Sequence, residues 1–324
     1  MQTVVSLDAP KTGGWREKFR AGARAFIPSR NHSALAVLSA FLLILSFPDF
    51  NLWPLAWVGL VPLLVAVARV ARARQAFALG WLAGALFFYG SCWWLTHSMI
   101  HYGGLSRPLA YALLVPVVVI VGVFPATFAF ALARLCARWG MYALVAAPPL
   151  WAASEWARLG LTGQLWNAIG YSQAFHPALI QSATWGGVYA IGFLILAINA
   201  AVALLYFKRD TRALLTAAVT FAAVALTLLQ DAPREAGRTD RQSPDAVVVA
   251  IQPNVSVNFG RSLEETATLV NRHLTMSADA LGEWERKQAD EDRRGDGRGS
   301  QPGDAGGRTK PVPRLVVWPE SPMN

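Results

Sequence analysis

Arg314-Leu315-Val316-Val317-Trp318-Pro319-Glu320-Ser321 is the stretch on which the interpretation of this chain depends. Its apolar, β-branched run predicts a buried strand, and Pro319 ends that strand because proline has no N–H to give to a sheet. A glutamate directly after a strand lies at the edge where open α/β folds place their chemistry. Glu320 is therefore a candidate catalytic carboxylate. A surface glutamate at a strand end is the alternative, and this stretch alone gives the two equal weight.

The composition upstream of this stretch indicates a membrane protein. The chain has 324 residues, of which 54% are hydrophobic, and a mean hydropathy of +0.34, which is too apolar for an ordinary soluble protein. Between residues 33 and 229 the only acids are Asp49, Glu155 and Asp210, whereas charges of both signs are dense from Asp231 onward. We therefore expect a basic cytoplasmic leader over residues 1–32, a transmembrane helical domain over 33–230 and a polar domain over 231–324.

The charge pattern does not indicate nucleic-acid binding, and the cysteines do not indicate a metal site. The net charge is +9, but in the first half the basic residues form short clusters between apolar stretches, as topology signals do. Cys92 and Cys136 lie in or beside apolar stretches, with no metal-ligand spacing and no disulfide framework. We expect them to pack as small apolar side chains, and we expect neither a metal nor a cofactor.

Apolar stretches predict about seven membrane spans. With seven, the basic clusters fall on one side, so the N-terminus is cytoplasmic and residues 231–324 are periplasmic in a double-membrane bacterium. Merging the first two spans would reverse this orientation. The predicted spans are residues 33–46, 52–68, 75–95, 108–132, 141–159, 179–207 and 213–229.

The polar part of the chain predicts the start of a β-α-β unit. A strand over residues 245–251 is followed by a helix over 263–284 and by the strand that ends before Glu320. Residues 286–312 have no hydrophobic period and predict a disordered insertion. Two parallel strands and one helix cannot cover both faces of a sheet, so we expect an N-terminal fragment of a longer protein.

Short motifs in a fixed order resemble those of the bacterial apolipoprotein N-acyltransferases. The resemblance implies a polytopic α-helical inner-membrane domain followed by the start of a nitrilase-like α/β domain, an α-β-β-α sandwich, here truncated. Phe259-Gly260-Arg261 departs from the Lys-Trp pair that the family often has near that place. The motifs are Ser46-Phe47-Pro48 with Trp53-Pro54, Ser154-Glu155-Trp156-Ala157-Arg158, Trp166-Asn167 with Gly170-Tyr171-Ser172-Gln173, Ile251-Gln252-Pro253-Asn254-Val255, and Val317-Trp318-Pro319-Glu320-Ser321.

The resemblance also implies a reaction. A cysteine thiolate takes an acyl chain from a phospholipid as a thioester and passes it to the N-terminal S-diacylglyceryl cysteine of an apolipoprotein. A glutamate acts as general base and a lysine helps to hold the oxyanion. Glu320 matches the glutamate, while the lysine and the cysteine of the family lie downstream of it. We therefore expect the chain as given to be inactive alone, and the implied partners are the phospholipid donor, the apolipoprotein acceptor and the membrane. No nucleic acid is expected, and the protein is expected to be a monomer.

Four residues in the fifth predicted span and the loop that follows it are candidates for substrate binding. Glu155 and Arg158 are three residues apart, so they lie on one face of a helix and are able to pair. An intramembrane acid is a functional hypothesis by default, with a paired structural role near the span end as the alternative. Trp166 and Tyr171 in the following loop complete the set.

His97 and His101 are four residues apart and would bind a metal only if their segment were helical. No third ligand is apparent, and a polar loop over residues 96–104 that caps the lipid entrance is the favoured interpretation.

Two other function classes remain open. A membrane transporter needs polar sites at the bilayer midplane, often in repeated halves, whereas the midspan regions here read as apolar. A membrane-tethered nitrilase-type amidase would not need so many spans. Transfer of labelled acyl chains from phospholipid to the full-length enzyme separates the acyltransferase from both.

Overall fold

The structure is a computed structural model that describes residues 26–228, 246–254, 262–295 and 314–318. The chain divides into two compact units, Met1–Pro233 and Arg234–Asn324, and each is described by itself. Most of the predicted basic leader and Glu320 lie outside the described residues.

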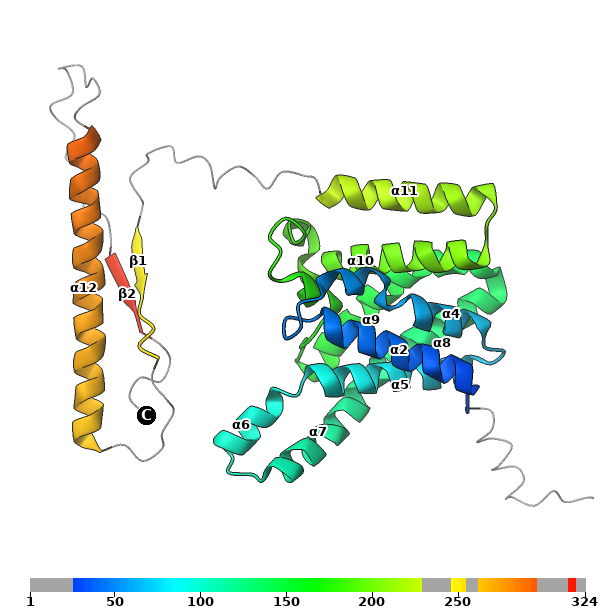
Figure 1. Cartoon of the computed structure of the whole chain (residues 1–324), viewed down its shortest axis with the longest axis horizontal. Coiled ribbons are helices and arrows are strands. Elements are labelled where there is room, and N and C mark those ends of the chain that lie inside the picture. The colour runs from blue at the N-terminus through cyan, green and yellow to red at the C-terminus, as the bar shows by residue number, and fades with distance from the viewer. Residues whose placement is uncertain (1–25, 229–245, 255–261, 296–313, 319–324) are drawn as a thin grey trace, which may run out of the picture. The chain divides into compact units, whose positions relative to one another are not determined.

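The described part of the first unit is a bundle of helices joined by short turns (Figure 1). Its elements are α2 (Arg30–Ser46), η1 (Trp53–Leu55), α3 (Ala56–Gly59), α4 (Val61–Arg69), α5 (Ala73–Ser91), α6 (Leu95–His101), α7 (Arg107–Val121), α8 (Val123–Trp139), η2 (Met141–Ala146), α9 (Ala147–Thr162), η3 (Ile169–Gln173), α10 (Ala183–Phe207) and α11 (Thr211–Leu228).

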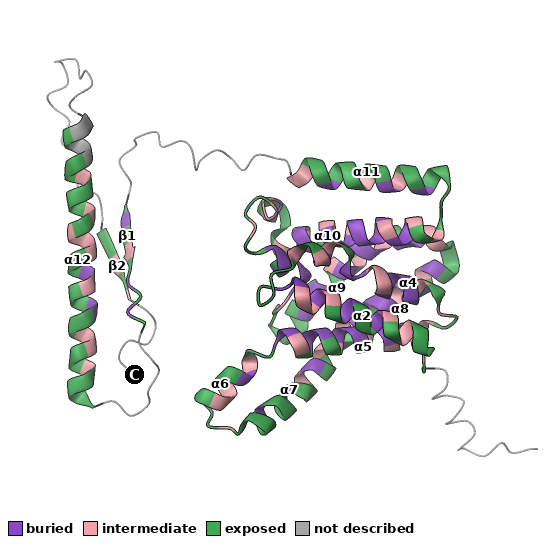
Figure 2. Ribbon diagram, in the orientation of Figure 1, coloured by how far each residue is buried: buried purple, intermediate pink, exposed green. Residues whose placement is uncertain are grey.

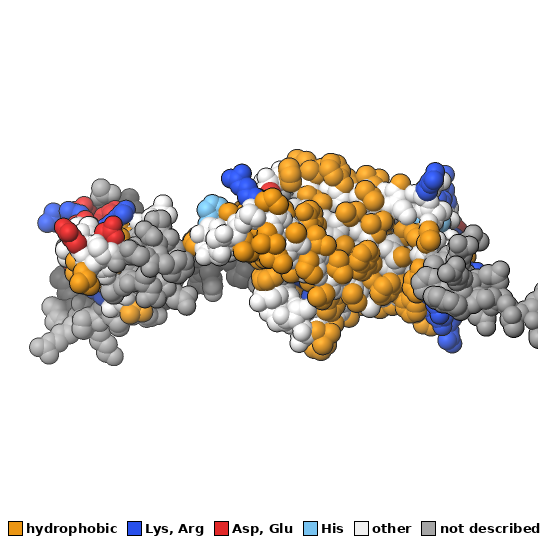
Figure 3. Space-filling model, turned by 90° about the horizontal axis from the view of Figure 1, so that it is seen from below, with side chains coloured by type: hydrophobic (Ala, Val, Ile, Leu, Met, Phe, Trp, Pro, Cys, Tyr) orange, Lys and Arg blue, Asp and Glu red, His pale blue; other side chains and the backbone are white. Residues whose placement is uncertain are grey.

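The bundle has the surface of a membrane domain. Large apolar side chains such as Ile120, Leu161 and Leu226 are exposed, and Figure 3 shows hydrophobic side chains over most of the visible face of the bundle. Within the described residues three helical stretches are long and apolar enough to cross a bilayer, or four if α5 and α6, which meet at 49°, form one span. The stretches are Arg107–Trp139, Ala183–Phe207 and Thr211–Leu228, with Arg30–Ser46 and Trp53–Arg69 as shorter apolar helices. The predicted membrane domain is thus supported, while the count of seven spans stays a prediction.

Two predicted boundaries differ from the structure. The span expected to end at Leu132 continues as α8 to Trp139, because arginine is a good helix former and Gly140, at φ 72°, supplies the left-handed residue that ends the helix. The segment expected to be a polar loop over residues 96–104 instead contains the short helix α6. Clustered charges and polar residues therefore do not by themselves end or prevent a helix.

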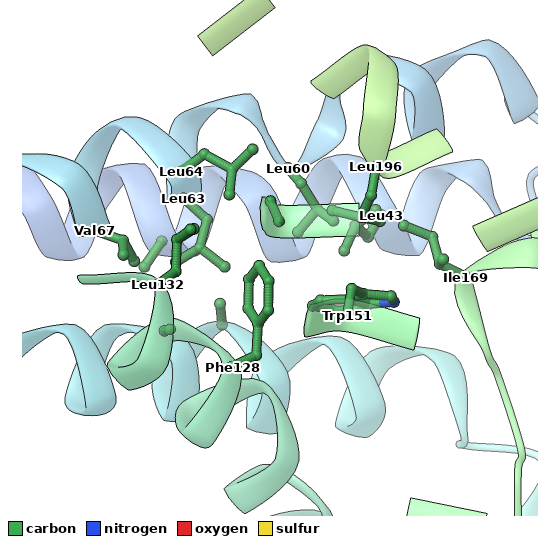
Figure 4. Close-up of a cluster of buried hydrophobic side chains, with 14 of the residues drawn as sticks. Leu43, Leu60, Leu63, Leu64, Val67, Phe128, Leu132, Trp151, Ile169 and Leu196 are labelled. Atoms are coloured by element: carbon green, nitrogen blue, oxygen red, sulfur yellow. The ribbon is translucent and has the colours of Figure 1, made fainter. Parts of the chain in front are cut away.

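The interior of the bundle is apolar and closely packed (Figure 2). Figure 4 shows Leu60 and Leu63 among side chains contributed by several helices, and the rings of Phe128 and Trp151 meet edge to face at 5.0 Å. Helices α5 and α8 approach most closely at Gly80, where an added Cβ would lie 2.4 Å from the carbonyl oxygen of Pro125. Such close approach through small residues is typical of helices that pack inside membranes.

The break between α3 and α4 is held by side chains from distant helices. Asn199 of α10 is fully buried; its Oδ1 accepts from the Leu60 N–H at 2.8 Å and its Nδ2 donates to the Ala56 carbonyl at 2.9 Å. Ser39 of α2 accepts from the Leu63 N–H at 2.9 Å. These contacts satisfy backbone groups that the helix break leaves unpaired in an apolar interior.

The described part of the second unit is a parallel β-α-β arrangement. Strands β1 (Val247–Ala250) and β2 (Arg314–Val317) pair with Val247 opposite Arg314 and Ala250 opposite Val317. Helix α12 (Leu263–Gly295) packs against β1. Its first turn contains Glu264 and Glu265, and the helix dipole stabilises acidic side chains there. The predicted strands and helix are present, and the nitrilase-like fold stays a prediction.

The structure differs from the expected disordered insertion over residues 286–312. Helix α12 runs on through residues 286–295, and the rest of the stretch lies outside the described residues. Glu283 and Lys287 form an i, i+4 ion pair at 2.7 Å across the expected helix end. A polar sequence without apolar period thus still continues a helix once an apolar stripe has started it.

Replacing Asn199 by leucine tests the polar lock at the α3–α4 break. We expect Asn199→Leu to lower the melting temperature of the detergent-solubilised protein, because it removes the buried amide that bonds the Leu60 N–H and the Ala56 carbonyl, at a cost of about 1–3 kcal/mol for a buried group left without its partner. Thr227→Val is the matched control, since that hydroxyl bonds only the Ala223 carbonyl of its own helix. Equal melting temperatures for the two variants would contradict the assignment.

Candidate functional site: the α9 face and the loop that follows it

Helix α9 presents two charged side chains to the interior of the bundle. Glu155 and Arg158 are each only 4% exposed, although charged groups are almost never fully buried without partners. Their spacing places them on one helix face, as predicted. The pair that this spacing allows has no short contact: the carboxylate oxygens and guanidinium nitrogens of these two described residues lie more than 4.0 Å apart.

Both side chains instead bind the backbone of the loop that follows α9. Glu155 Oε1 accepts from the Ile169 N–H at 2.8 Å, and Arg158 Nη1 donates to the Trp166 carbonyl at 2.6 Å. The guanidinium also lies over the ring of Phe88, 5.0 Å from its centroid. The two charges therefore hold the two ends of the Trp166–Ile169 backbone against α9.

Further polar contacts fasten the same loop to other helices. Asn167 has a left-handed φ of 51°, which asparagine tolerates, and its Nδ2 donates to the Ser91 carbonyl at 2.8 Å. At the end of the loop the buried Gln173 donates to the Trp53 carbonyl at 3.2 Å and accepts from Trp57 Nε1 at 3.3 Å. The loop is thus fixed to α9, to the end of α5 and to the start of the α3 region.

An apolar cavity opens between α5, α7, α9 and this loop. Its volume is about 250 Å³, and Arg158 is the one charged side chain among the described residues that line it. Arg158 also lies within electrostatic range of Cys92 and Tyr171. The wall includes Phe88, Cys92, Val118, Val121, Arg158 and Trp166.

A more open hollow shares the lining residues Trp166 and Gln164 with this cavity. It has a volume of about 470 Å³, and Trp166, Asn167, Tyr171 and Pro48 are among its lining residues. Trp166 lines both spaces, and its ring meets that of Trp94 edge to face at 5.7 Å. The structure therefore brings together all four candidates of the membrane part: Glu155 and Arg158 beneath the loop, Trp166 and Tyr171 on it.

Several buried polar atoms near Glu155 make no hydrogen bond of good geometry. Glu155 Oε2, Trp151 Nε1 and the Tyr189 hydroxyl have none among the described residues, although Trp151 lies near enough to the Glu155 carboxylate for a weaker one. Trp151 and Glu155 share a small cavity of about 20 Å³ with Arg158 and Asn167. A cavity of that size holds one water molecule when polar groups line it.

The sequence also singles out two histidines, two cysteines, Glu320 and one loop tripeptide. The rings of His97 and His101 are stacked with centroids 3.9 Å apart on α6, and no cluster of three metal-ligating side chains occurs among the described residues. Cys92 and Cys136 are both buried. Glu320 and Phe259-Gly260-Arg261 lie outside the described residues.

Asn199 is a buried polar residue that hydrophobic pattern alone did not indicate. The midspan regions were expected to be apolar, yet this residue lies inside α10 and is fully buried. Its sequence context does indicate a role, because a lone amide within an otherwise apolar span usually bonds to another helix or to backbone groups.

Comparison with known proteins identifies the family. The family model described as the apolipoprotein N-acyltransferase N-terminal domain matches residues 39–201. An apolipoprotein N-acyltransferase of Geobacter metallireducens is 38% identical over 53% of this chain and 33% of its own length. Those of Chlorobaculum tepidum and Sinorhizobium medicae are 30% and 28% identical over 68% and 93% of this chain, and 41% and 54% of their own lengths. The chain thus spans about a third to a half of the length of these curated relatives, and it belongs to the apolipoprotein N-acyltransferase family.

Proposed function

We propose that this chain provides the membrane domain and the first part of the catalytic domain of an N-acyltransferase of lipoprotein maturation. The observation that carries the proposal is the buried Arg158 on the wall of an otherwise apolar cavity, in a chain of this family. A phospholipid offers the matching chemistry, with apolar chains and an anionic phosphate. A planar guanidinium suits phosphate oxygens because it donates hydrogen bonds in a fixed fork.

The cavity accepts part of the acyl donor. Its volume of about 250 Å³ is below the usual range of drug-sized pockets, so it holds a segment of one acyl chain and not a whole lipid. Trp166 and Gln164 line both this apolar space and the open hollow. We assign the apolar side to the acyl chain and the hollow, lined by Asn167 and Tyr171, to the more polar part of the donor.

The proposed reaction uses Glu320 as the general base. Glu320 takes the proton of a cysteine thiol, and the thiolate attacks the sn-1 ester carbonyl of the phospholipid. A lysine stabilises the oxyanion, the ester C–O bond breaks, and the lysophospholipid leaves with the proton. The α-amine of the S-diacylglyceryl cysteine then attacks the thioester, giving the amide and the free thiol. This cysteine and this lysine belong to the family pattern downstream of Glu320.

The proposed topology follows from the charge pattern. We propose an inner-membrane protein whose N-terminus is cytoplasmic, with about seven spans and residues 231–324 in the periplasm. Strands β1 and β2 pair in parallel and α12 connects them, which supports the start of a nitrilase-like sandwich in residues 231–324.

Substituting Glu320 in the full-length enzyme tests the proposed base. We expect Glu320→Gln to abolish thioester formation from labelled phospholipid, because the amide does not accept the thiol proton, while membrane insertion is unchanged. The control is Glu283→Gln, which removes a carboxylate that pairs only with Lys287 on the surface of α12. Normal thioester accumulation in Glu320→Gln would refute the role. A wild-type enzyme that forms no thioester but hydrolyses soluble amides would favour the amidase.

Substituting Glu155 tests whether it holds the loop. We expect Glu155→Leu to increase hydrogen exchange over residues 163–173, because the Ile169 N–H loses its acceptor at a cost of about 1–3 kcal/mol. Glu155→Gln is the matched control, since its Oε1 still accepts that hydrogen bond. The measurement is exchange detected by mass spectrometry on the solubilised protein. Equal exchange in the two variants would rule out this role.

A further inference from the structure

Helix α12 carries two polar residues where its apolar stripe is most buried. The stripe includes Leu269, Met276 and Leu281, which are partly buried. Between them His273 is fully buried and Ser277 is 8% exposed. A leucine at either position would bury more apolar surface without a polar group to satisfy. Polar residues in such places are expected where the sequence serves something other than stability.

Both residues contact the tryptophan that follows β2. Trp318 Nε1 donates to Ser277 Oγ at 3.1 Å, and that hydroxyl donates to the His273 carbonyl at 2.6 Å. The rings of His273 and Trp318 lie with centroids 5.1 Å apart at an angle of 50°. The indole is therefore held at its polar edge by Ser277 and contacted by the imidazole of His273.

The imidazole of His273 is itself fixed. Its Nδ1 lies 2.7 Å from the Leu269 carbonyl, and because a carbonyl only accepts, Nδ1 carries the proton. Its Nε2 is buried without a partner among the described residues. The ring thus has a set tautomer and orientation, and it retains one free acceptor beside Trp318.

Trp318 stands two residues before Glu320 in the sequence, with Pro319 between them. Proline fixes its own φ near −65°, and a residue that precedes proline is restricted to extended conformations. Fixing the indole of Trp318 therefore limits the directions in which the chain leaves β2.

We propose that His273 and Ser277 are positioning residues for Glu320. They anchor Trp318 and so set where the carboxylate is presented to the nucleophile. The inference rests on the proposed function, in which Glu320 is the general base, and it assigns α12 a part in the reaction beyond covering the sheet.

The test compares variants of the full-length enzyme in thioester formation from labelled phospholipid. We expect Ser277→Ala and His273→Phe to lower the maximal rate about 10-fold to 100-fold, the range expected for a base misplaced by about 1 Å, with an unchanged half-saturating phospholipid concentration. Ser277→Thr, which retains the hydroxyl for Trp318, should restore the rate. Thr268→Ala is the control, because that hydroxyl bonds only the Glu264 carbonyl of the same helix.

A second readout does not depend on activity. Hydrogen exchange at β2 and Trp318 should rise in Ser277→Ala and stay at the wild-type level in Thr268→Ala and Ser277→Thr. Wild-type rates and wild-type exchange in folded Ser277→Ala and His273→Phe would overturn the inference while leaving the proposed function intact. A wild-type enzyme without thioester formation would defeat the proposed function, and the exchange comparison would then decide alone whether Ser277 anchors Trp318.

Discussion

Backbone groups inside an apolar bundle must find partners within the protein, and this constraint governs the first unit. Asn199 and Ser39 satisfy the break between α3 and α4, and Glu155, Arg158 and Gln173 satisfy the loop after α9. The contacts of Asn199, Ser39 and Gln173 join different helical segments, whereas those of Glu155 and Arg158 join α9 to the loop that follows it. The same few polar side chains therefore hold together helices that apolar packing alone would leave free to slide against each other.

The geometry of the candidate site follows from these contacts. Arg158 and Glu155 hold the backbone of the loop whose Trp166 lines both the apolar cavity and the open hollow. The buried charges are thus explained without a direct ion pair: each binds a backbone group of opposite polarity. Arg158 also lines the cavity, so one residue both holds the loop and contributes a charged side chain to the cavity wall.

The sequence could predict those features that depend on local pattern. The apolar helices, the β-α-β order and the grouping of Glu155, Arg158, Trp166 and Tyr171 follow from hydrophobic period, helix spacing and motif order. It could not predict the partners of Asn199, because these depend on packing between distant segments. It did not indicate the α6 helix or the continuation of α12 to Gly295, because polar residues alone neither end nor prevent a helix. Glu155 and Arg158, whose spacing allows them to pair, bind the loop backbone instead, and that choice of partners also depends on tertiary packing.

The most direct measurement of the central claim follows the acyl group to its final acceptor. The full-length enzyme is incubated with labelled phospholipid and a peptide that begins with S-diacylglyceryl cysteine, and the peptide is analysed by mass spectrometry. The account predicts a labelled acyl chain in amide linkage at the α-amine of that cysteine. An unmodified peptide in the presence of folded, membrane-inserted enzyme would contradict it.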